Sequence, residues 1–159
     1  MLRSKIKSPH SLKIIFSQLK KRGERIVFTN GCFDLLHFGH VSYLREAKKR
    51  GDVLVVGVNS DTSVRRIKGK NRPIIDEKNR LSVIAALESV DYVVLFSEDT
   101  PLNLIKALRP DILVKGADWD KKDIVGADFV SSYGGEVIVI KLSKGYSTTK
   151  IIRKIAKTF

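Results

Sequence analysis

One stretch of the sequence limits the possible folds more than any other. Residues 30–40 read Asn-Gly-Cys-Phe-Asp-Leu-Leu-His-Phe-Gly-His, after the apolar run 26–28 and before a helical pattern over residues 41–50. This order predicts that a strand ends here, turns and leads into a helix. In an open α/β sheet, ligands bind beyond the carboxyl ends of the strands. The stretch is therefore a candidate binding site.

The side chains in this stretch indicate an anionic ligand. His37 and His40 are three residues apart, so both point the same way on a helix or tight turn. Gly31 and Gly39 lack a β-carbon and let the backbone approach a bulky group, and a helix N-terminus offers unpaired N–H groups to an anion. A metal site and a purely structural turn are the alternatives. Structural zinc usually has four ligands, and the chain holds one cysteine and three histidines, so we favour a phosphate.

The rest of the chain alternates between strands and helices. We expect helices over residues 8–22, 41–50, 62–67, 77–87, 101–108 and 147–157, and strands over 25–29, 53–58, 92–96, 112–114 and 137–140. Such alternation predicts an α/β fold with a doubly wound, mostly parallel five-stranded sheet, Rossmann-like in type. At 159 residues we expect one domain, with a helical extension over residues 1–24 and a catalytic core over 25–159.

Composition narrows the classes of function. The net charge is +13, from 30 basic and 17 acidic residues, but there is no long basic run and no interleaving of aromatic residues. We therefore consider nucleic acid an unlikely partner, although a basic nucleic-acid-binding module stays an alternative. A positive field also suits an enzyme with phosphorylated substrates. One cysteine allows no internal disulfide, and no apolar leader or membrane-length run is present. We expect a cytoplasmic protein with no membrane partner.

Three more polar stretches follow predicted strands. The basic loop 68–72, with Arg80 on the next helix, offers cations for phosphoryl groups, or is only a solvated loop. Residues 115–120 contain a glycine for close approach, an acidic pair and a tryptophan that could stack on a ring or cover the core. Residues 145–150 form a glycine turn before the last helix, which is a second phosphate site or an ordinary cap.

Two stretches described above, residues 31–40 and residues 145–149, resemble signatures of a known protein family. Residues 31–40 match all six fixed positions of the signature G-x-F-D-x-x-H-x-G-H, so the chain resembles the cytidylyltransferase-like nucleotidyltransferases. Residues 145–149 resemble that family's second signature, G-[IY]-S-T-[ST]. Within the family, residues 27–34, 56–61 and 109–116 are most similar to the adenylyltransferases of ADP-heptose synthesis. The resemblance implies transfer of AMP from ATP to a sugar 1-phosphate, with release of pyrophosphate.

The resemblance also implies roles for particular residues. His37, His40, Lys68 and Arg80 would be catalytic, as phosphate-binding groups. The implied nucleotide-binding residues are Asn30, Gly31, Cys32, Phe33, Asp34, Gly39, Lys115, Gly116, Asp118, Tyr146, Ser147 and Thr148. No protein metal site is implied, and Mg²⁺ would be held mainly by the triphosphate.

The family also suggests partners and rival substrates. A homodimer is possible, and a sugar 1-phosphate made by another protein is expected because the sequence contains no sugar kinase half. Glycerol-3-phosphate cytidylyltransferases and FMN adenylyltransferases share the same signatures. These two activities are therefore the alternatives within the same chemistry.

Overall fold

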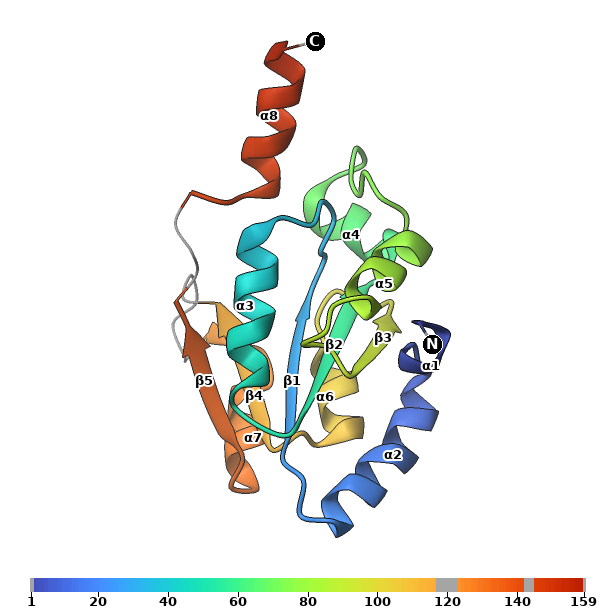
Figure 1. The fold of residues 1–159 in the computed structure, drawn as a ribbon, viewed down its shortest axis with the longest axis vertical. Coiled ribbons are helices and arrows are strands. Elements are labelled where there is room, and N and C mark those ends of the chain that lie inside the picture. Colours follow the sequence, from blue (N-terminus) through green and yellow to red (C-terminus); the bar gives the residue numbers. More distant parts are fainter. Residues whose placement is uncertain (1, 117–122, 142–144, 159) are drawn as a thin grey trace.

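A five-stranded sheet forms the centre of the molecule in a computed structural model that describes residues 2–116, 123–141 and 145–158. Its strands are β1 (Ile26–Gly31), β2 (Val53–Asn59), β3 (Tyr92–Phe96), β4 (Ile112–Gly116) and β5 (Glu136–Ile140). Every pairing is parallel, in the order β3-β2-β1-β4-β5 (Figure 1). The prediction of a doubly wound five-stranded sheet is therefore confirmed.

Helices connect and cover the strands. They are α1 (Leu2–Lys5), α2 (Pro9–Lys21), α3 (Phe38–Lys48), α4 (Asp61–Lys68), α5 (Glu77–Ala85), α6 (Leu102–Leu108), α7 (Ala127–Ser132) and α8 (Thr148–Thr158). The sequence did not predict α1 and α7, because neither is long enough to display a helical period. Within the described ranges, no helix is long and apolar enough to cross a membrane.

Side-chain caps fix where several helices begin. The side chains of Ser8, Ser60 and Asp76 each accept a hydrogen bond from the backbone N–H three residues later. Each bond satisfies one N–H that the helix itself leaves unpaired. Ser60 directly follows β2, so its cap places the start of α4 at the carboxyl end of that strand.

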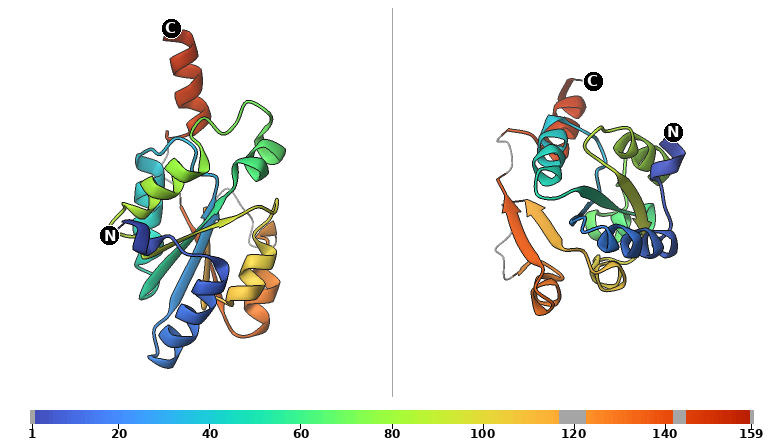
Figure 2. Two further views of the ribbon diagram at one scale, coloured as in Figure 1. Left: turned by 90° about the vertical axis from the view of Figure 1, so that its right-hand side faces the viewer. Right: turned by 60° about the horizontal axis from the view of Figure 1, so that its bottom comes forward.

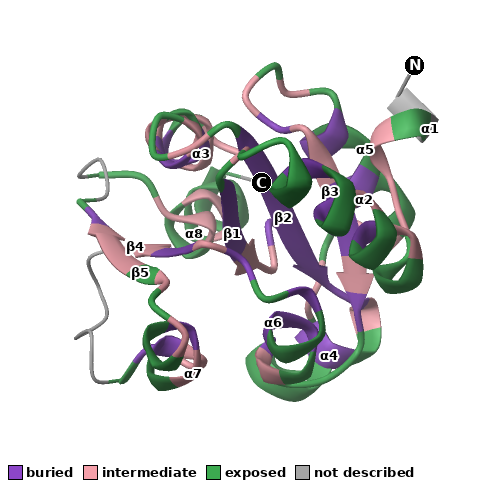
Figure 3. Ribbon diagram, turned by 90° about the horizontal axis from the view of Figure 1, so that it is seen from below, coloured by how far each residue is buried: buried purple, intermediate pink, exposed green. Residues whose placement is uncertain are grey.

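The central strands β1 and β2 are buried on both faces, so the core has two halves. Ile26 and Phe28 of β1 pack with α2, α6 and α7 on one face. Val27, between them, packs with α3 and α5 on the other. Figure 2 shows these helices on the two sides of the sheet, and in Figure 3 burial follows β1 and β2 through the middle of the molecule. Alternation along each strand thus produces three layers.

The described part of residues 1–24, expected to be a helical extension, packs against the rest of the chain through α2 and Ile6. Leu12, Phe16 and Leu19 of α2 are at most 4% exposed and belong to the core. Ile6 forms a parallel bridge with Val93 at the outer edge of β3. This bridge covers part of an edge that would otherwise present unpaired backbone groups.

The last helix has a different setting. Figure 1 shows α8 standing away from the sheet at the end of the chain. None of its described residues is buried. Its first turn, however, reaches the carboxyl end of the sheet, where Thr148 Oγ1 donates a hydrogen bond to the carbonyl of Leu35 at 3.3 Å.

Candidate active site

The order of the strands creates a natural place for a ligand. The chain builds outward from β1 through β2 to β3, then crosses back to place β4 on the other side of β1. The connections therefore diverge between the carboxyl ends of β1 and β4, which is where open α/β sheets bind ligands. A cavity of about 450 Å³ opens at this point and is lined by both strand ends.

The two histidines lie at the beginning of α3. His37 is the last residue before the helix, and His40 lies in its first turn. Their rings stack with centroids 3.8 Å apart and planes 16° from parallel. The spacing argument from the sequence therefore gave the correct relative orientation. Gly39 is needed here because a β-carbon would lie 2.9 Å from Cβ of Tyr146 and 3.0 Å from Nδ1 of His37.

Both imidazoles are neutral near pH 7 in the ligand-free protein. Burial, and then the neighbouring His37, lower the pKa of His40 to about 4. Burial also lowers the pKa of His37. Each Nδ1 is buried without a hydrogen-bond partner among the described residues. A bound phosphate would favour the protonated rings, since a nearby opposite charge stabilises the charged form.

A second segment faces the histidines. Ser147 and Thr148, at the start of α8, line the same cavity as His40. The ring of Tyr146 lies 6.2 Å from the ring of His37 and 5.3 Å from that of Phe38. The two predicted phosphate-binding stretches, more than 100 residues apart in sequence, thus meet at one cavity.

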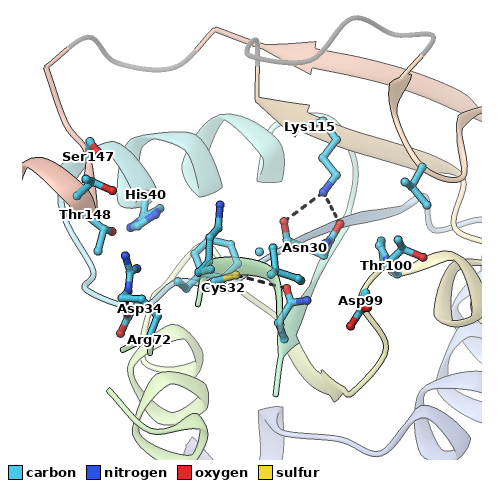
Figure 4. Close-up of a pocket in the computed structure, with 18 of the residues that line it drawn as sticks. Asn30, Cys32, Asp34, His40, Arg72, Asp99, Thr100, Lys115, Ser147 and Thr148 are labelled. Atoms are coloured by element: carbon cyan, nitrogen blue, oxygen red, sulfur yellow. Dashed lines mark hydrogen bonds and ion pairs between the residues drawn. The ribbon is translucent and has the colours of Figure 1, made fainter. Parts of the chain in front are cut away.

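Lys115 lies on the floor of the cavity. Its Nζ donates a hydrogen bond to Oδ1 of Asn30 at 2.5 Å, across the junction between β4 and β1. Burial lowers the pKa of Lys115 to about 8. A fixed cation at this point can bind an anionic group that spans the two strand ends. Figure 4 shows Lys115 and Asn30 in contact at the pocket.

Comparison with known proteins shows the family to which this chain belongs. A family model described as cytidylyltransferase-like matches residues 28–154. The bifunctional protein HldE of Geobacter metallireducens is 56% identical over 156 residues, which cover 98% of this chain and 32% of that protein. A lipopolysaccharide core biosynthesis protein from Thermoplasma volcanium has a solved structure with 38% identity and a TM-score of 0.64. That match covers 79% of this chain and all of the solved one. This chain belongs to the cytidylyltransferase-like family.

Two further facts define the extent of these likenesses. The chain spans about a third of the length of the curated relatives it matches. A pantoate-β-alanine ligase from Francisella tularensis, 18% identical with a TM-score of 0.61, shares the fold; the match covers 96% of this chain and 76% of that one.

The carboxylate of Asp34, a fixed residue of the family signature, forms hydrogen bonds and an ion pair within the protein. It accepts hydrogen bonds from the backbone N–H groups of Ile74 at 2.8 Å and Ile75 at 2.9 Å, and it pairs with Nε of Arg72. Burial acts to raise the pKa of Asp34, but these donors outweigh it and lower the pKa. Asp34 lines the cavity, and its carboxylate binds the loop that follows Lys68.

Arg80 is also committed to protein contacts. Its guanidinium donates to the carbonyls of Ile75 at 2.9 Å and Cys32 at 2.5 Å and pairs with Asp61 at 2.8 Å. The side chain is 0% exposed and does not line the cavity among the described residues. The structure thus places this predicted catalytic residue behind the site, where it supports the turn at Cys32.

The other predicted site residues line the cavity, line an adjoining hollow or lie outside the described residues. The residues of that set that line the shared cavity are Asn30, Gly31, Cys32, Phe33, His40, Lys68, Lys115, Ser147 and Thr148. A connected hollow of about 400 Å³ adds His37, Gly39, Gly116 and Tyr146. Asp118 lies outside the described residues.

The sequence reasoning missed the opposite end of the cavity. Asn59, Asp99 and Thr100 line it, and none was a candidate. Asn59 is the last residue of β2, and residues 97–100 follow β3 directly. The same rule that selected the other strand ends could have found both segments, but their side chains match no motif.

Proposed function

We propose that this protein transfers AMP from ATP to a sugar 1-phosphate and releases pyrophosphate. The acceptor we propose is D-glycero-β-D-manno-heptose 1-phosphate, which would give ADP-heptose. Membership of the cytidylyltransferase-like family supports the reaction class. The HldE relatives, the likeness to a lipopolysaccharide core biosynthesis protein and the sequence resemblance to heptose adenylyltransferases support the acceptor.

One observation carries this proposal: the site consists of two hollows with a common border. We call the first the His37 hollow, lined also by Gly39, Tyr43, Gly116 and Tyr146. The second is the Asp99 hollow, lined also by Asn59, Ile67, Arg72 and Thr100. Side chains that can donate to phosphate line both hollows, among them His40, Lys68, Lys115, Ser147 and Thr148. A transfer between two bound substrates needs such an arrangement, with the reacting phosphorus at the border.

The reaction follows from this arrangement. A phosphate oxygen of the acceptor attacks the α-phosphorus of ATP in line, the bond from that phosphorus to the bridging oxygen breaks, and pyrophosphate leaves. A phosphomonoester has a second pKa of about 6, so the attacking oxygen is already ionised at neutral pH and needs no general base. Catalysis then comes from positioning and from stabilisation of charge.

The side chains that line the two hollows have separate roles in this scheme. His37 and His40 would hold the triphosphate with the N–H groups and hydroxyls of Ser147 and Thr148 at the start of α8. Lys68 and Lys115 would stabilise the charge that develops at the transferring phosphoryl group. Asp34 and Arg80, through the contacts described above, would act as positioning residues.

We propose that Mg²⁺ enters with the nucleotide. Within the described part of the chain, no three His, Cys, Asp or Glu side chains come together to hold a metal ion. Mg²⁺ commonly keeps several waters and binds through substrate phosphates, where it neutralises charge. The ion would therefore be carried mainly by the β- and γ-phosphates.

The test is pyrophosphate release in the presence of Mg²⁺. ATP, CTP and GTP are each combined with heptose 1-phosphate, glycerol 3-phosphate and FMN. We expect release with ATP and heptose 1-phosphate. Release only with CTP and glycerol 3-phosphate, or only with ATP and FMN, would replace the substrate and keep the reaction class. A folded protein that releases nothing in any combination contradicts the proposal. Binding to DNA or RNA that weakens steeply with salt would then favour the basic module.

A further inference from the structure

The Asp99 hollow is built differently from the rest of the site. Figure 4 shows Asp99 and Thr100 on one side of the pocket and His40, Ser147 and Thr148 on the other, with Asn30 and Cys32 between them. The residues on the histidine side suit an anion. Those on the Asp99 side include a carboxylate, a hydroxyl and an amide, which suit the uncharged hydroxyl groups of a ligand.

Helix α4 holds this wall of the hollow in place. Ser63 Oγ donates to the carbonyl of Glu98 at 2.8 Å, and Arg66 Nη2 donates to the carbonyl of Ser97 at 2.5 Å. Arg66 Nε also bonds Oδ1 of Asp99 at 2.6 Å. The loop from Ser97 to Thr100 is thus fixed at three points before any ligand binds. Such preorganisation favours specific recognition, because the cost of ordering the loop is already met by folding.

The loop leaves polar atoms available to a ligand. Arg66 binds one carboxylate oxygen of Asp99, and the second oxygen has no partner among the described residues. The Thr100 hydroxyl likewise bonds none of them. By contrast, Asn59 is 3% exposed and its Nδ2 donates to Ser63 Oγ at 3.0 Å. We therefore place Asn59 in the floor of the hollow and Asp99 and Thr100 at its contact surface.

The other lining residues narrow the class of ligand. Ile67 and Ile124 supply an apolar wall, which can pack on the C–H groups of a sugar, and Lys68 and Arg72 supply cations for its phosphate. The described residues that line this hollow but not the His37 hollow include no aromatic side chain to stack on a flavin. A polyhydroxylated phosphate ester fits this set of groups better than FMN does.

We propose that Asp99 and Thr100 are specificity-determining residues that bind hydroxyl groups of the acceptor sugar phosphate. This inference rests on the proposed function and adds to it the residues that select a polyol. The carboxylate would accept hydrogen bonds from the sugar hydroxyls, and the Thr100 hydroxyl would donate or accept one. A ligand without those hydroxyls would make no hydrogen bonds with these two exposed side chains and would bind more weakly.

The test compares the KM values for the two substrates in Asp99→Asn and Thr100→Val. With heptose 1-phosphate as acceptor, we expect KM to rise about tenfold in Asp99→Asn and about threefold in Thr100→Val. KM for ATP should stay within about twofold of the wild-type value, because the nucleotide occupies the other hollow. A general disturbance of the site would move both constants, whereas a loss of folded protein would lower the apparent kcat and move neither KM.

Two further variants separate recognition from structure. Arg66→Gln removes the ion pair with Asp99 but keeps the carboxylate, so its effect on the acceptor KM should be smaller than that of Asp99→Asn. Glu136→Gln is a matched charge control, because Glu136 also forms an exposed pair with an arginine, Arg25, at 2.5 Å, at the other end of the sheet. It should leave both KM values unchanged.

The outcomes distinguish this inference from the proposed function. An active enzyme whose acceptor KM is unchanged in Asp99→Asn and Thr100→Val overturns the role of these residues and leaves the reaction intact. So does an Arg66→Gln variant that reproduces the full effect of Asp99→Asn, because the loop rather than the carboxylate would then matter. A wild-type protein that releases no pyrophosphate with any pair overturns the proposed function and this inference with it.

Discussion

The two ends of the sheet use polar side chains in opposite ways. At the amino end, Asp52 accepts from the backbone N–H of Arg25 at 2.7 Å, and Asp111 accepts from that of Ile26 at 2.9 Å. Asp91 accepts from the N–H of Leu54 at 2.7 Å and pairs with a lysine. Each carboxylate thus accepts a hydrogen bond from a backbone N–H group at or next to the start of a strand. At the carboxyl end, the polar groups of the histidines and of Asp99 include atoms without partners among the described residues.

This difference separates stability from function. A buried backbone group must find a hydrogen bond, so a side chain that supplies one contributes directly to folding. A side chain that faces a cavity with its polar atoms unpaired adds little to folding and is available to a ligand. Substitutions at the amino end should therefore affect unfolding, and those at the carboxyl end should affect activity. Four predictions test this contrast.

The largest effect is expected for His40→Ala at the carboxyl end. Loss of one well-placed donor to a transferring phosphoryl group costs on the order of 10²–10³ in rate. We expect kcat to fall by about this factor while the far-UV circular dichroism stays unchanged. His10→Ala is the matched control, since His10 is exposed on α2, and it should keep wild-type turnover. Wild-type turnover in His40→Ala would contradict the role of the histidines.

At the amino end, Asp91→Ala should have the reverse effect. The substitution leaves the N–H of Leu54 without its acceptor, and Lys48 keeps the carbonyl of Asp52 but loses its ion pair. We expect the free energy of unfolding to fall by about 1–3 kcal/mol, measured by urea denaturation. The KM values for ATP and acceptor should not change. A raised KM without loss of stability would show that the two ends are not separate in function.

Lys115 gives a test that depends on pH. Its pKa of about 8 means that the ligand-free protein loses this charge as the pH rises from 7 to 9. If only the cation binds the nucleotide, ATP affinity falls by up to about tenfold over this range. Lys115→Arg keeps its charge at these pH values, so its pH dependence should be flatter, measured by isothermal titration calorimetry. Equal pH profiles would exclude Lys115 as the titrating group.

The fourth prediction concerns the neutral histidines. The pKa of His40 is about 4 in the folded protein and ordinarily 6.5, so between these values the unfolded chain binds more protons. The free energy of unfolding should therefore rise as the pH increases from 4 to 6.5, by up to about 3 kcal/mol, and level off above. In His40→Asn this part of the rise should disappear. An unchanged pH profile would show that burial does not keep this ring neutral.

Much of the fold could be predicted from the sequence. Continuous apolar runs such as residues 53–58 predicted strands buried on both faces, and capping side chains at Ser8, Ser60 and Asp76 marked helix starts. Both kinds of signal are local, because they depend on a residue and its near neighbours in the chain. Helix α7 was missed since a helix of six residues shows too little of a period.

The candidate site was predicted only in part. Local spacing correctly oriented His37 and His40, and the strand-end rule selected Lys68, Lys115 and Ser147, which meet at one cavity. The protonation state of the rings could not be predicted, because burial, and for His40 also the neighbouring His37, lower their pKa values. A pKa depends on solvent and on neighbours in space, and the order of residues does not state either.

The sequence by itself determined the alternation of strands and helices, the ends of several helices and the motif between β1 and α3. Only the tertiary structure decided how the charged groups are used. Asp34 lines the cavity with its carboxylate bound to Ile74 and Ile75, and Arg80 binds Cys32 and Asp61 outside it. Asp99 also lines the cavity, and only one of its carboxylate oxygens has a partner among the described residues. The physical reason is that a charged side chain binds whatever partner folding brings within hydrogen-bond distance, and these partners come from distant parts of the chain.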